Sequence, residues 1–278
     1  MTTKRPSAKP KRAAPKERSA EAPKRMALKK GSAEEPKRAA PSEDGADPVV
    51  SLQEAIRAAL RAHGEPAKAE GMRAYMKSAM PCFGVPATPL RALLKPLFVE
   101  YTLSDKAAWQ RAVLTIYREA EHREERYAAI ELSGARPYKG YQDLDAVPMY
   151  EEMIVTGAWW DLVDTIAVHR IGPILRANPK PMKKLLLAWS RGPHMWKRRT
   201  AILSQIAFKK ATDVDLLGRV IEPNMADKEF FLRKGIGWAL RAHAYVDPEW
   251  VRRFVRENEG ALSGLSKREA LKNIGEGD

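Results

Sequence analysis

Trp159-Trp160-Asp161-Leu162-Val163-Asp164 is the most informative stretch of this 278-residue sequence. Trp160 has counterparts at a fixed interval, because Arg199 follows it by 39 residues and Trp238 follows Arg199 by another 39. Each of the three lies in a segment whose apolar residues recur with helical spacing. We therefore predict that one helical unit repeats about every forty residues, as in solenoids of stacked helix pairs.

The rest of the chain from Val49 onward also has a helical pattern. Apolar residues at helical spacing mark a first helix around Ile56 and a second around Met72, Tyr75 and Met76. We find no sustained alternation of apolar and polar residues with β-branched enrichment, which would indicate strands. The sequence therefore predicts an all-α fold, namely a HEAT-like helical-repeat solenoid.

Caps and prolines predict where helices begin and end. Thr88-Pro89 is typical of an N-cap followed by proline at the first helical position, which predicts a helix over Leu90–Phe98. Ser266 and Glu269 have the spacing of a capping box that opens a last short helix. Later prolines are expected at helix boundaries, because an interior proline removes a backbone hydrogen bond; they are Pro137, Pro148, Pro173, Pro179, Pro181, Pro193, Pro223 and Pro248.

Composition limits the classes of function. Lys and Arg number 49 against 35 Asp and Glu, and the formal net charge of +14 favours nucleic acid or another anionic surface as partner. Cys82 is the only cysteine, so a disulfide framework is excluded and a reducing compartment is expected. There is no run of about eighteen apolar residues and no apolar segment typical of a secretory signal at the N-terminus. We expect a cytoplasmic, nucleoid-associated protein.

The composition changes near residue 49. Residues 1–49 carry thirteen basic and seven acidic side chains and no aromatic residue, and Pro-Lys-Arg recurs there at intervals of 13 residues. Such a segment cannot bury enough apolar surface to offset its ordering entropy. We predict a disordered basic tail over 1–49 and one folded domain over 50–278. The tail either adds non-specific attraction to phosphates or serves only as a solubilising extension.

Trp160 and Asp164 are the first candidates for a functional site. They are four residues apart and so share one helix face, whereas Asp161 in the first turn can complement the helix dipole. Asp164 interrupts a run of apolar residues, and a carboxylate at a buried edge is costly unless it is paired or used. The alternatives are a catalytic carboxylate and an aspartate bonded to an arginine of the neighbouring repeat.

Two later segments combine basic and aromatic residues. Lys197-Arg198-Arg199 lies in the first turn of a predicted helix, where basic side chains can hold phosphates beside exposed backbone amides or can be a solvated charge run. In the segment from Glu229 to Arg241, helical spacing puts Lys234, Trp238 and Arg241 on one face. Such a face suits phosphate contact and base stacking, although it is also typical of half-buried helices with snorkelling Lys and Arg.

Other chemistries have little support in the sequence. The five histidines show no metal-ligand spacing, and a single cysteine cannot build a zinc site. Gly235-Ile236-Gly237 lies within a predicted helix and is not a phosphate-cradling loop. No Ser-His-Asp or Cys-His arrangement stands out. We therefore expect neither a metal nor another cofactor.

Together these segments resemble the DNA alkylation repair enzymes, a bacterial family of HEAT-like repeats, over residues 52–273. The resemblance is carried by six stretches in order: 73–77, 88–91, 154–164, 196–203, 230–238 and 265–272. The chain departs from the family over Tyr138–Val147, which is longer and more polar, and at Ala207, where a basic residue is expected.

The resemblance implies a monofunctional glycosylase that excises cationic N3- or N7-alkylated purines from duplex DNA as part of base excision repair. It implies that Asp164 is the catalytic carboxylate, that Trp160 and Trp238 are aromatic walls, and that Arg199 clamps a phosphate. It further predicts DNA contacts by Tyr75, Thr88, Phe230, Lys234 and Arg241. The family holds the lesion against the backbone side while the base stays stacked, and we expect this chain to act as a monomer.

The chemistry of the lesion agrees with that site. A purine alkylated at N7 or N3 is positively charged and departs as a neutral base, so the second acid of ordinary glycosidases is not needed. One carboxylate and two indole faces stabilise the oxocarbenium-like sugar by electrostatics and cation–π attraction. The main alternative is a catalytically silent HEAT-like module that recognises unusual DNA structure, and a third is a protein-binding scaffold.

Overall fold

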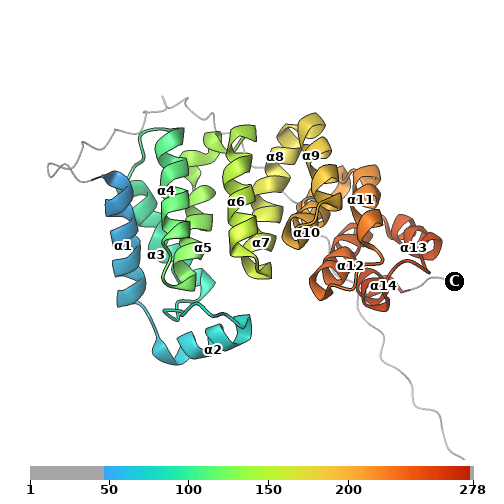
Figure 1. Cartoon of the computed structure of the whole chain (residues 1–278), viewed down its shortest axis with the longest axis horizontal. Coiled ribbons are helices and arrows are strands. Elements are labelled where there is room, and N and C mark those ends of the chain that lie inside the picture. The colour runs from blue at the N-terminus through green and yellow to red at the C-terminus, as the bar shows by residue number, and fades with distance from the viewer. Residues whose placement is uncertain (1–46, 276–278) are drawn as a thin grey trace, which may run out of the picture. The chain divides into compact units, whose positions relative to one another are not determined.

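The computed structural model describes residues 47–275, and every regular element in that range is a helix (Figure 1). The predicted tail lies almost entirely outside the described residues. The α-helices are α1 Pro48–Ala62, α2 Pro66–Met76, α3 Ala87–Glu100, α4 Lys106–Arg118, α5 Arg123–Ser133, α6 Val147–Gly157, α7 Trp160–Ile166, α8 Gly172–Ala177, α9 Pro179–Arg191, α10 Met195–Leu203, α11 Val214–Ile221, α12 Phe230–Ala244, α13 Pro248–Glu257 and α14 Gly264–Leu271. Short 3₁₀ segments are η1 Arg136–Tyr141, η2 Leu144–Ala146, η4 Ile206–Ala211 and η5 Glu222–Asn224, and η3 Ala167–Ile171 is a π-helix.

Hydrogen bonds between helices recur at nearly the interval that the sequence predicts. Many of them join residues between 33 and 40 positions apart, so the polar side chains of one helix bind the corresponding helix of the next unit. Examples are Arg91 with Glu131, Arg123 with Asp161, Arg170 with Ile130, Asp164 with Arg199, and Lys234 with Glu269. The predicted all-α repeat solenoid is confirmed for the described residues.

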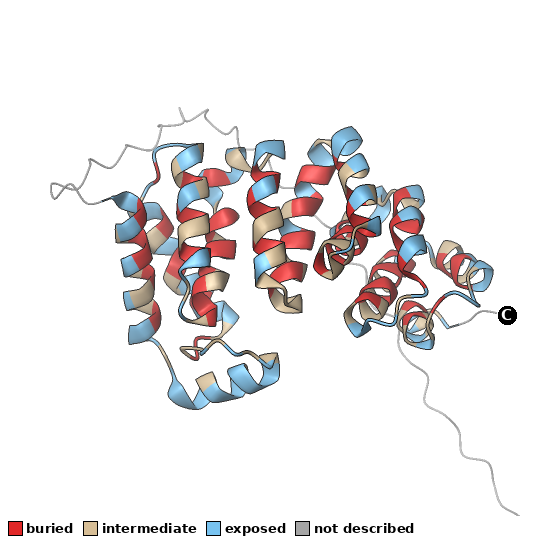
Figure 2. Cartoon of the chain, viewed as in Figure 1, coloured by how far each residue is buried: buried red, intermediate tan, exposed pale blue. Residues whose placement is uncertain are grey.

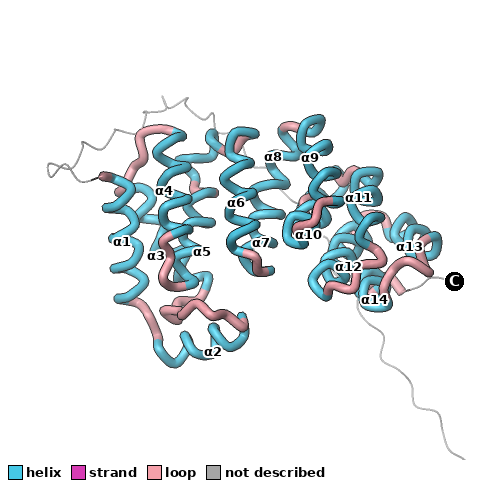
Figure 3. The backbone as a smooth tube through the Cα atoms, viewed as in Figure 1, coloured by secondary structure: helices cyan, strands magenta, loops and turns pink. Residues whose placement is uncertain are grey.

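Buried side chains form one hydrophobic core along these helices, from Val49 in α1 to Ala270 in α14 (Figure 2). Helix α2 is the exception, because none of its residues is buried. It lies beyond the ends of the neighbouring helices in Figure 1, with a loop at each end (Figure 3). The apolar residues predicted to mark α2, including Met72 and Met76, therefore face a cavity instead of the core.

Pro173 lies in the first turn of α8, at a helix start as the sequence predicts, but no break separates α8 from the elements before it. It lies inside a continuous helical run that α7, η3 and α8 form from Trp160 to Ala177. Proline has no N–H for the helical ladder and clashes with the preceding turn. The π-turn accommodates it, and the Gly172 N–H donates to the carbonyl of Ala167, five residues earlier. The widened turn follows directly after the segment that holds Asp164.

Two helix starts differ from the sequence prediction. Helix α3 begins at Ala87, so Thr88 and Pro89 lie within its first turn and Pro86 is the N-cap. Helix α14 begins at Gly264, and Ser263 caps it by accepting a hydrogen bond from the backbone of Ser266. In the part of the chain that the structure describes, no helix is long and apolar enough to cross a membrane.

Candidate functional site

At the start of α7, the side chains of the neighbouring residues Trp159 and Trp160 point in different directions, one toward the core and the other toward the candidate site. Ala158 ends α6 in the left-handed region, with φ 41° and ψ 39°, and this sharp turn sends the two indoles to different environments. Trp159 is half-buried and packs against the core, its ring centroid 6.2 Å from that of Trp196 and 5.3 Å from that of Phe231. Trp160 lines a cavity instead.

That cavity, here called the carboxylate cavity, has a volume of about 770 Å³ and brings together four of the predicted site residues. Trp160 and Asp164 come from α7, Trp238 from α12 and Tyr75 from α2. The Tyr75 ring meets that of Trp160 edge to face, with centroids 6.2 Å apart. Apolar side chains cover much of the remaining wall: Met72, Met76, Val85, Pro86, Leu90 and Ile130.

Asp164 is held from behind by Arg199 of α10. The guanidinium donates through Nε to Oδ1 and through Nη2 to Oδ2, each at 2.7 Å. The side chains of Arg199 and Asp164 are only 4% and 13% exposed. Burial raises the pKa of the Asp164 carboxyl, while the hydrogen bonds from Arg199 act in the opposite direction. The carboxylate thus reaches the cavity as one half of a buried ion pair.

The position of Arg199 bears on its predicted role as a phosphate clamp. Its third donor group, Nη1, binds the carbonyl of Phe231, so the guanidinium is committed to protein oxygens on two helices. Gly235 of α12 makes room for it, because a Cβ there would lie 3.0 Å from Nη1. The pairing of Asp164 with an arginine of the neighbouring repeat is the arrangement that the sequence left open as the alternative to catalysis. A contact between Arg199 and DNA stays a prediction.

A second buried ion pair in the same wall was missed by the sequence reasoning. Arg123 of α5 donates to both oxygens of Asp161, at 2.9 and 2.5 Å, and the Tyr127 hydroxyl donates to Asp161 at 2.5 Å. Asp161 and Tyr127 both line the carboxylate cavity. Asp161 is therefore part of a network between repeats, which its place in the first helical turn does not reveal. The signal that could have found it is the spacing of 38 residues between Arg123 and Asp161.

The other predicted DNA contacts do not line the carboxylate cavity. Thr88 is exposed at the start of α3, and Phe230 at the start of α12 is 52% exposed. Lys234 and Arg241 both bind Glu269 of α14, at 2.5 Å for Lys234. Arg241 also lines a neighbouring hollow, which it shares with Trp238. The structure thus places these four side chains on two helices, α3 and α12, and their contact with DNA stays a prediction.

Comparisons with known proteins show which family and which solved structure this chain is similar to. The family model of the DNA alkylation repair enzyme matches residues 56–274. A solved structure from Enterococcus faecalis, described as a predicted DNA alkylation repair enzyme, has a TM-score of 0.70 and 29% sequence identity. It covers 77% of this chain and 98% of its own. The comparison with functionally curated proteins gave no match.

Proposed function

Because the chain belongs to the DNA alkylation repair enzyme family, we propose that it is a monofunctional DNA glycosylase. In this proposal it hydrolyses the N-glycosidic bond of cationic N3- or N7-alkylated purines in duplex DNA, as a HEAT-like monomer in base excision repair. The observation that carries the proposal is the Asp164 carboxylate in a cavity walled by Trp160, Trp238 and Tyr75.

The residues of that cavity suit a leaving group that is already charged. Departure of a cationic purine needs no proton from the enzyme, because the base leaves neutral and the positive charge moves to the sugar. The charge that must be stabilised is then on the oxocarbenium-like sugar, and an anionic carboxylate stabilises it through electrostatics. The indole faces of Trp160 and Trp238 favour the same cation through their quadrupoles.

Arg199 supports this role by keeping Asp164 ionised and fixed in place. Burial favours the protonated carboxyl, and the two hydrogen bonds from the guanidinium favour the carboxylate. The bidentate geometry also sets the direction of the carboxylate, since an arginine fork binds both oxygens in one plane. We therefore assign Arg199 chiefly to positioning Asp164, with its phosphate contact a separate expectation.

The same ion pair favours a second candidate function, a catalytically silent module that binds unusual DNA structure. A carboxylate whose two oxygens are both bound by Arg199 can be purely structural, as such pairs are between helical repeats. In that case the cavity would hold DNA without cleaving the glycosidic bond, and Asp164 would contribute only to stability.

Release of free base from defined duplexes distinguishes the two functions. Purified protein is incubated with duplexes that each carry one 7-methylguanine, one bulky N7 adduct or one uracil, and the liberated base is quantified by chromatography. The glycosylase should release the cationic bases, including the bulky one, and leave uracil in place. Binding of all three duplexes without any release would establish the silent module, and release of uracil with rejection of the bulky adduct would exclude the proposed mechanism.

A further inference from the structure

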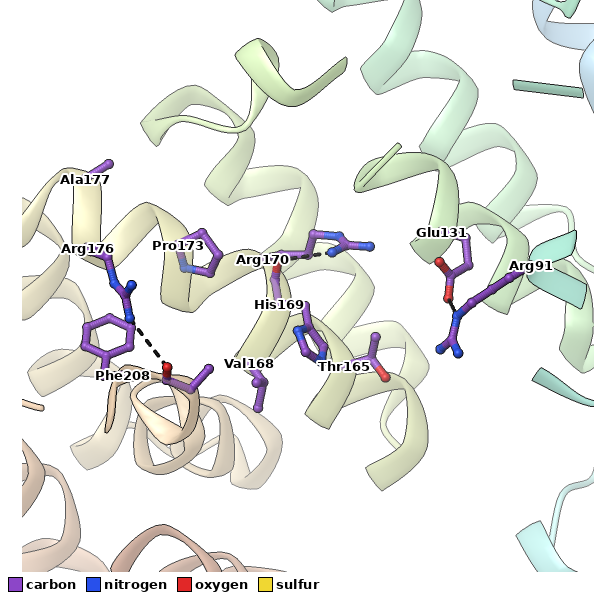
Figure 4. Close-up of a pocket in the computed structure, with 11 residues that line it drawn as sticks. Arg91, Glu131, Thr165, Val168, His169, Arg170, Pro173, Arg176, Ala177 and Phe208 are labelled. Carbon is purple, nitrogen blue, oxygen red and sulfur yellow. Dashed lines mark hydrogen bonds and ion pairs between the residues drawn. The ribbon is translucent and has the colours of Figure 1, made fainter. Parts of the chain in front are cut away.

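We propose that a second cavity, beside the carboxylate cavity, binds a phosphate of duplex DNA through Arg170 and Arg176. This phosphate cavity also has a volume of about 770 Å³. Figure 4 shows Arg91 and Glu131 on one side of it, Arg176 and Phe208 on the other, and Arg170 between them. The inference rests on the proposed function only in taking duplex DNA as the partner.

Arg170 is a partly buried cation that binds no carboxylate among residues 47–275. It donates to three uncharged oxygens: the Ser133 hydroxyl at 2.9 Å and the carbonyls of His169 and Ile130 at 3.0 and 2.7 Å. Burial lowers the pKa of its guanidinium, and the nearby charge of Glu131 acts in the opposite direction. Three of the five N–H groups of an arginine are used in this way, so two remain for a ligand.

The surroundings hold Arg170 in this position. Gly134 lies against it so closely that a Cβ there would be 2.1 Å from Nη2. The π-turn of η3 widens the backbone where Arg170 projects, and π-turns in long helices occur frequently at functional sites. A guanidinium that is fixed by three protein oxygens before a ligand arrives loses little entropy when it binds.

Arg176 supplies a second unpaired charge at the opposite wall. Its guanidinium carbon lies 4.4 Å from the centre of the Phe208 ring, and its one hydrogen bond is a long contact of 3.5 Å to the carbonyl of Ala207. The only carboxylate that lines the cavity, that of Glu131, is bound by Arg91 at 2.7 Å. Among the described residues the cavity therefore has an excess of two positive charges, which suits a phosphate oxyanion.

The neighbouring hollows indicate that this phosphate belongs to a polymer. The phosphate cavity shares Arg91, Glu131 and Thr165 with the carboxylate cavity, so the two are continuous. On its other side Phe208 also lines the hollow that contains Lys209, Lys210 and Trp238. A DNA strand whose lesion lies at Asp164 can reach this row of cations with its neighbouring phosphates, whereas a free phosphate ion would fill only one of them.

Arg176→Gln is the variant that tests the inference, because Arg176 is exposed and its replacement leaves the core intact. The matched control is Arg256→Gln, which removes the same charge from an exposed position of α13 that lines none of the cavities described above. Affinity for an undamaged 20-base-pair duplex is measured for wild type and both variants between 50 and 200 mM salt. Losing one phosphate contact should reduce the slope of log K against log salt by about 0.9.

The ratio of the wild-type affinity for DNA to that of Arg176→Gln should therefore decrease about 3- to 4-fold over this fourfold change in salt. The affinity of Arg256→Gln should change with salt as that of the wild type does. Equal slopes for wild type and Arg176→Gln would overturn the proposal. A parallel titration with inorganic phosphate tests the other source of the anion. Saturable phosphate binding that needs Arg176, without a change in the DNA slope, would assign the cavity to free phosphate and overturn it as well. Because the duplex is undamaged, this result is independent of whether the protein releases bases.

Discussion

Replacing Asp164 with asparagine should separate its proposed role in catalysis from its ion pair with Arg199. The variant keeps the size of the side chain but removes the negative charge that faces the cavity. The loss of one preorganised charge-stabilising group in other enzymes lowers the rate by roughly 10²–10³, or about 2.7–4 kcal/mol of barrier. We expect a loss of that size in base release.

The same substitution should also destabilise the fold, because Arg199 is only 4% exposed and would lose its charged partner. Breaking a buried ion pair from one side costs roughly 3–5 kcal/mol. The lower end applies here, since the asparagine oxygen still accepts one hydrogen bond. A loss of about 3 kcal/mol corresponds to a decrease in Tm of roughly 6–12 °C for a domain of this size.

A double variant distinguishes chemistry from stability. In Asp164→Asn/Arg199→Met both charges are gone, so no uncompensated buried charge remains, and that charge is the main cost of breaking a buried pair from one side. The Tm should return toward the wild-type value, while single-turnover release of 7-methylguanine at saturating enzyme stays low. Wild-type rates in Asp164→Asn, or a rate that returns together with the Tm in the double variant, would show that Asp164 is only structural.

Three further outcomes are expected. As the pH falls, base release should be lost at a higher pH than the one at which an aspartate is usually protonated. The reason is that burial raises the pKa of Asp164 and only the ionised form acts. A single-turnover pH–rate profile that stays flat down to about pH 4 would contradict this. Deleting residues 1–46 should leave the Tm unchanged and weaken binding to undamaged DNA at low salt but not at high salt, as measured by fluorescence anisotropy. Gly237→Ala should cost about 1–3 kcal/mol of unfolding free energy by denaturant titration, because its Cβ would lie 2.4 Å from that of Glu269. The matched control Gly71→Ala, with nothing within 4 Å, should be neutral or stabilising by up to about 1 kcal/mol.

The fold and the centre of the site could be predicted from the sequence because both depend on periodicity. Helical spacing within segments and the interval of 39 residues between Trp160, Arg199 and Trp238 predicted stacked helices. The structure places Trp160, Asp164 and Trp238 around one cavity, whereas Arg199, the equivalent position in the repeat between the two tryptophans, does not line it. Tyr75 reaches the same cavity from α2, where only the family resemblance could point to it.

The pairing of charges could not be predicted in the same way. Whether Arg199 faces DNA or Asp164 depends on the register between α10 and α7, and a register shift of one residue would change the answer without changing the helical pattern. The hydrogen bonds of Asp161 with Arg123 and Tyr127 could not be predicted from the sequence for the same reason. These contacts join helices that are far apart in sequence, so local spacing carries little information about them.

The prediction of helix ends was wrong for a different physical reason. Several neighbouring residues have side chains that can cap a helix equally well. Ser263 and Ser266 are both good N-caps three residues apart, and the structure uses Ser263 while the Ser266 hydroxyl donates to the carbonyl of Arg233. Glu269, expected to complete a capping box, is taken instead by Lys234 and Arg241 of α12. Tertiary partners thus decided between alternatives that are close in energy in the isolated helix.

The repeat architecture also makes the site depend on the stacking of successive units. Asp164 lies on α7, its partner Arg199 on α10, and α12 supplies both Trp238 and the Phe231 carbonyl that binds Arg199. In a solenoid each unit contacts only its neighbours, so a terminal unit can open while the others stay folded. Loosening α12 would therefore remove one aromatic wall and free the arginine that orients the carboxylate, while α1 to α6 remain packed. As denaturant is added, activity is expected to be lost before most of the helical circular dichroism signal. The site needs α7, α10 and α12 to be packed together, whereas most of the other helices stay folded when α12 loosens.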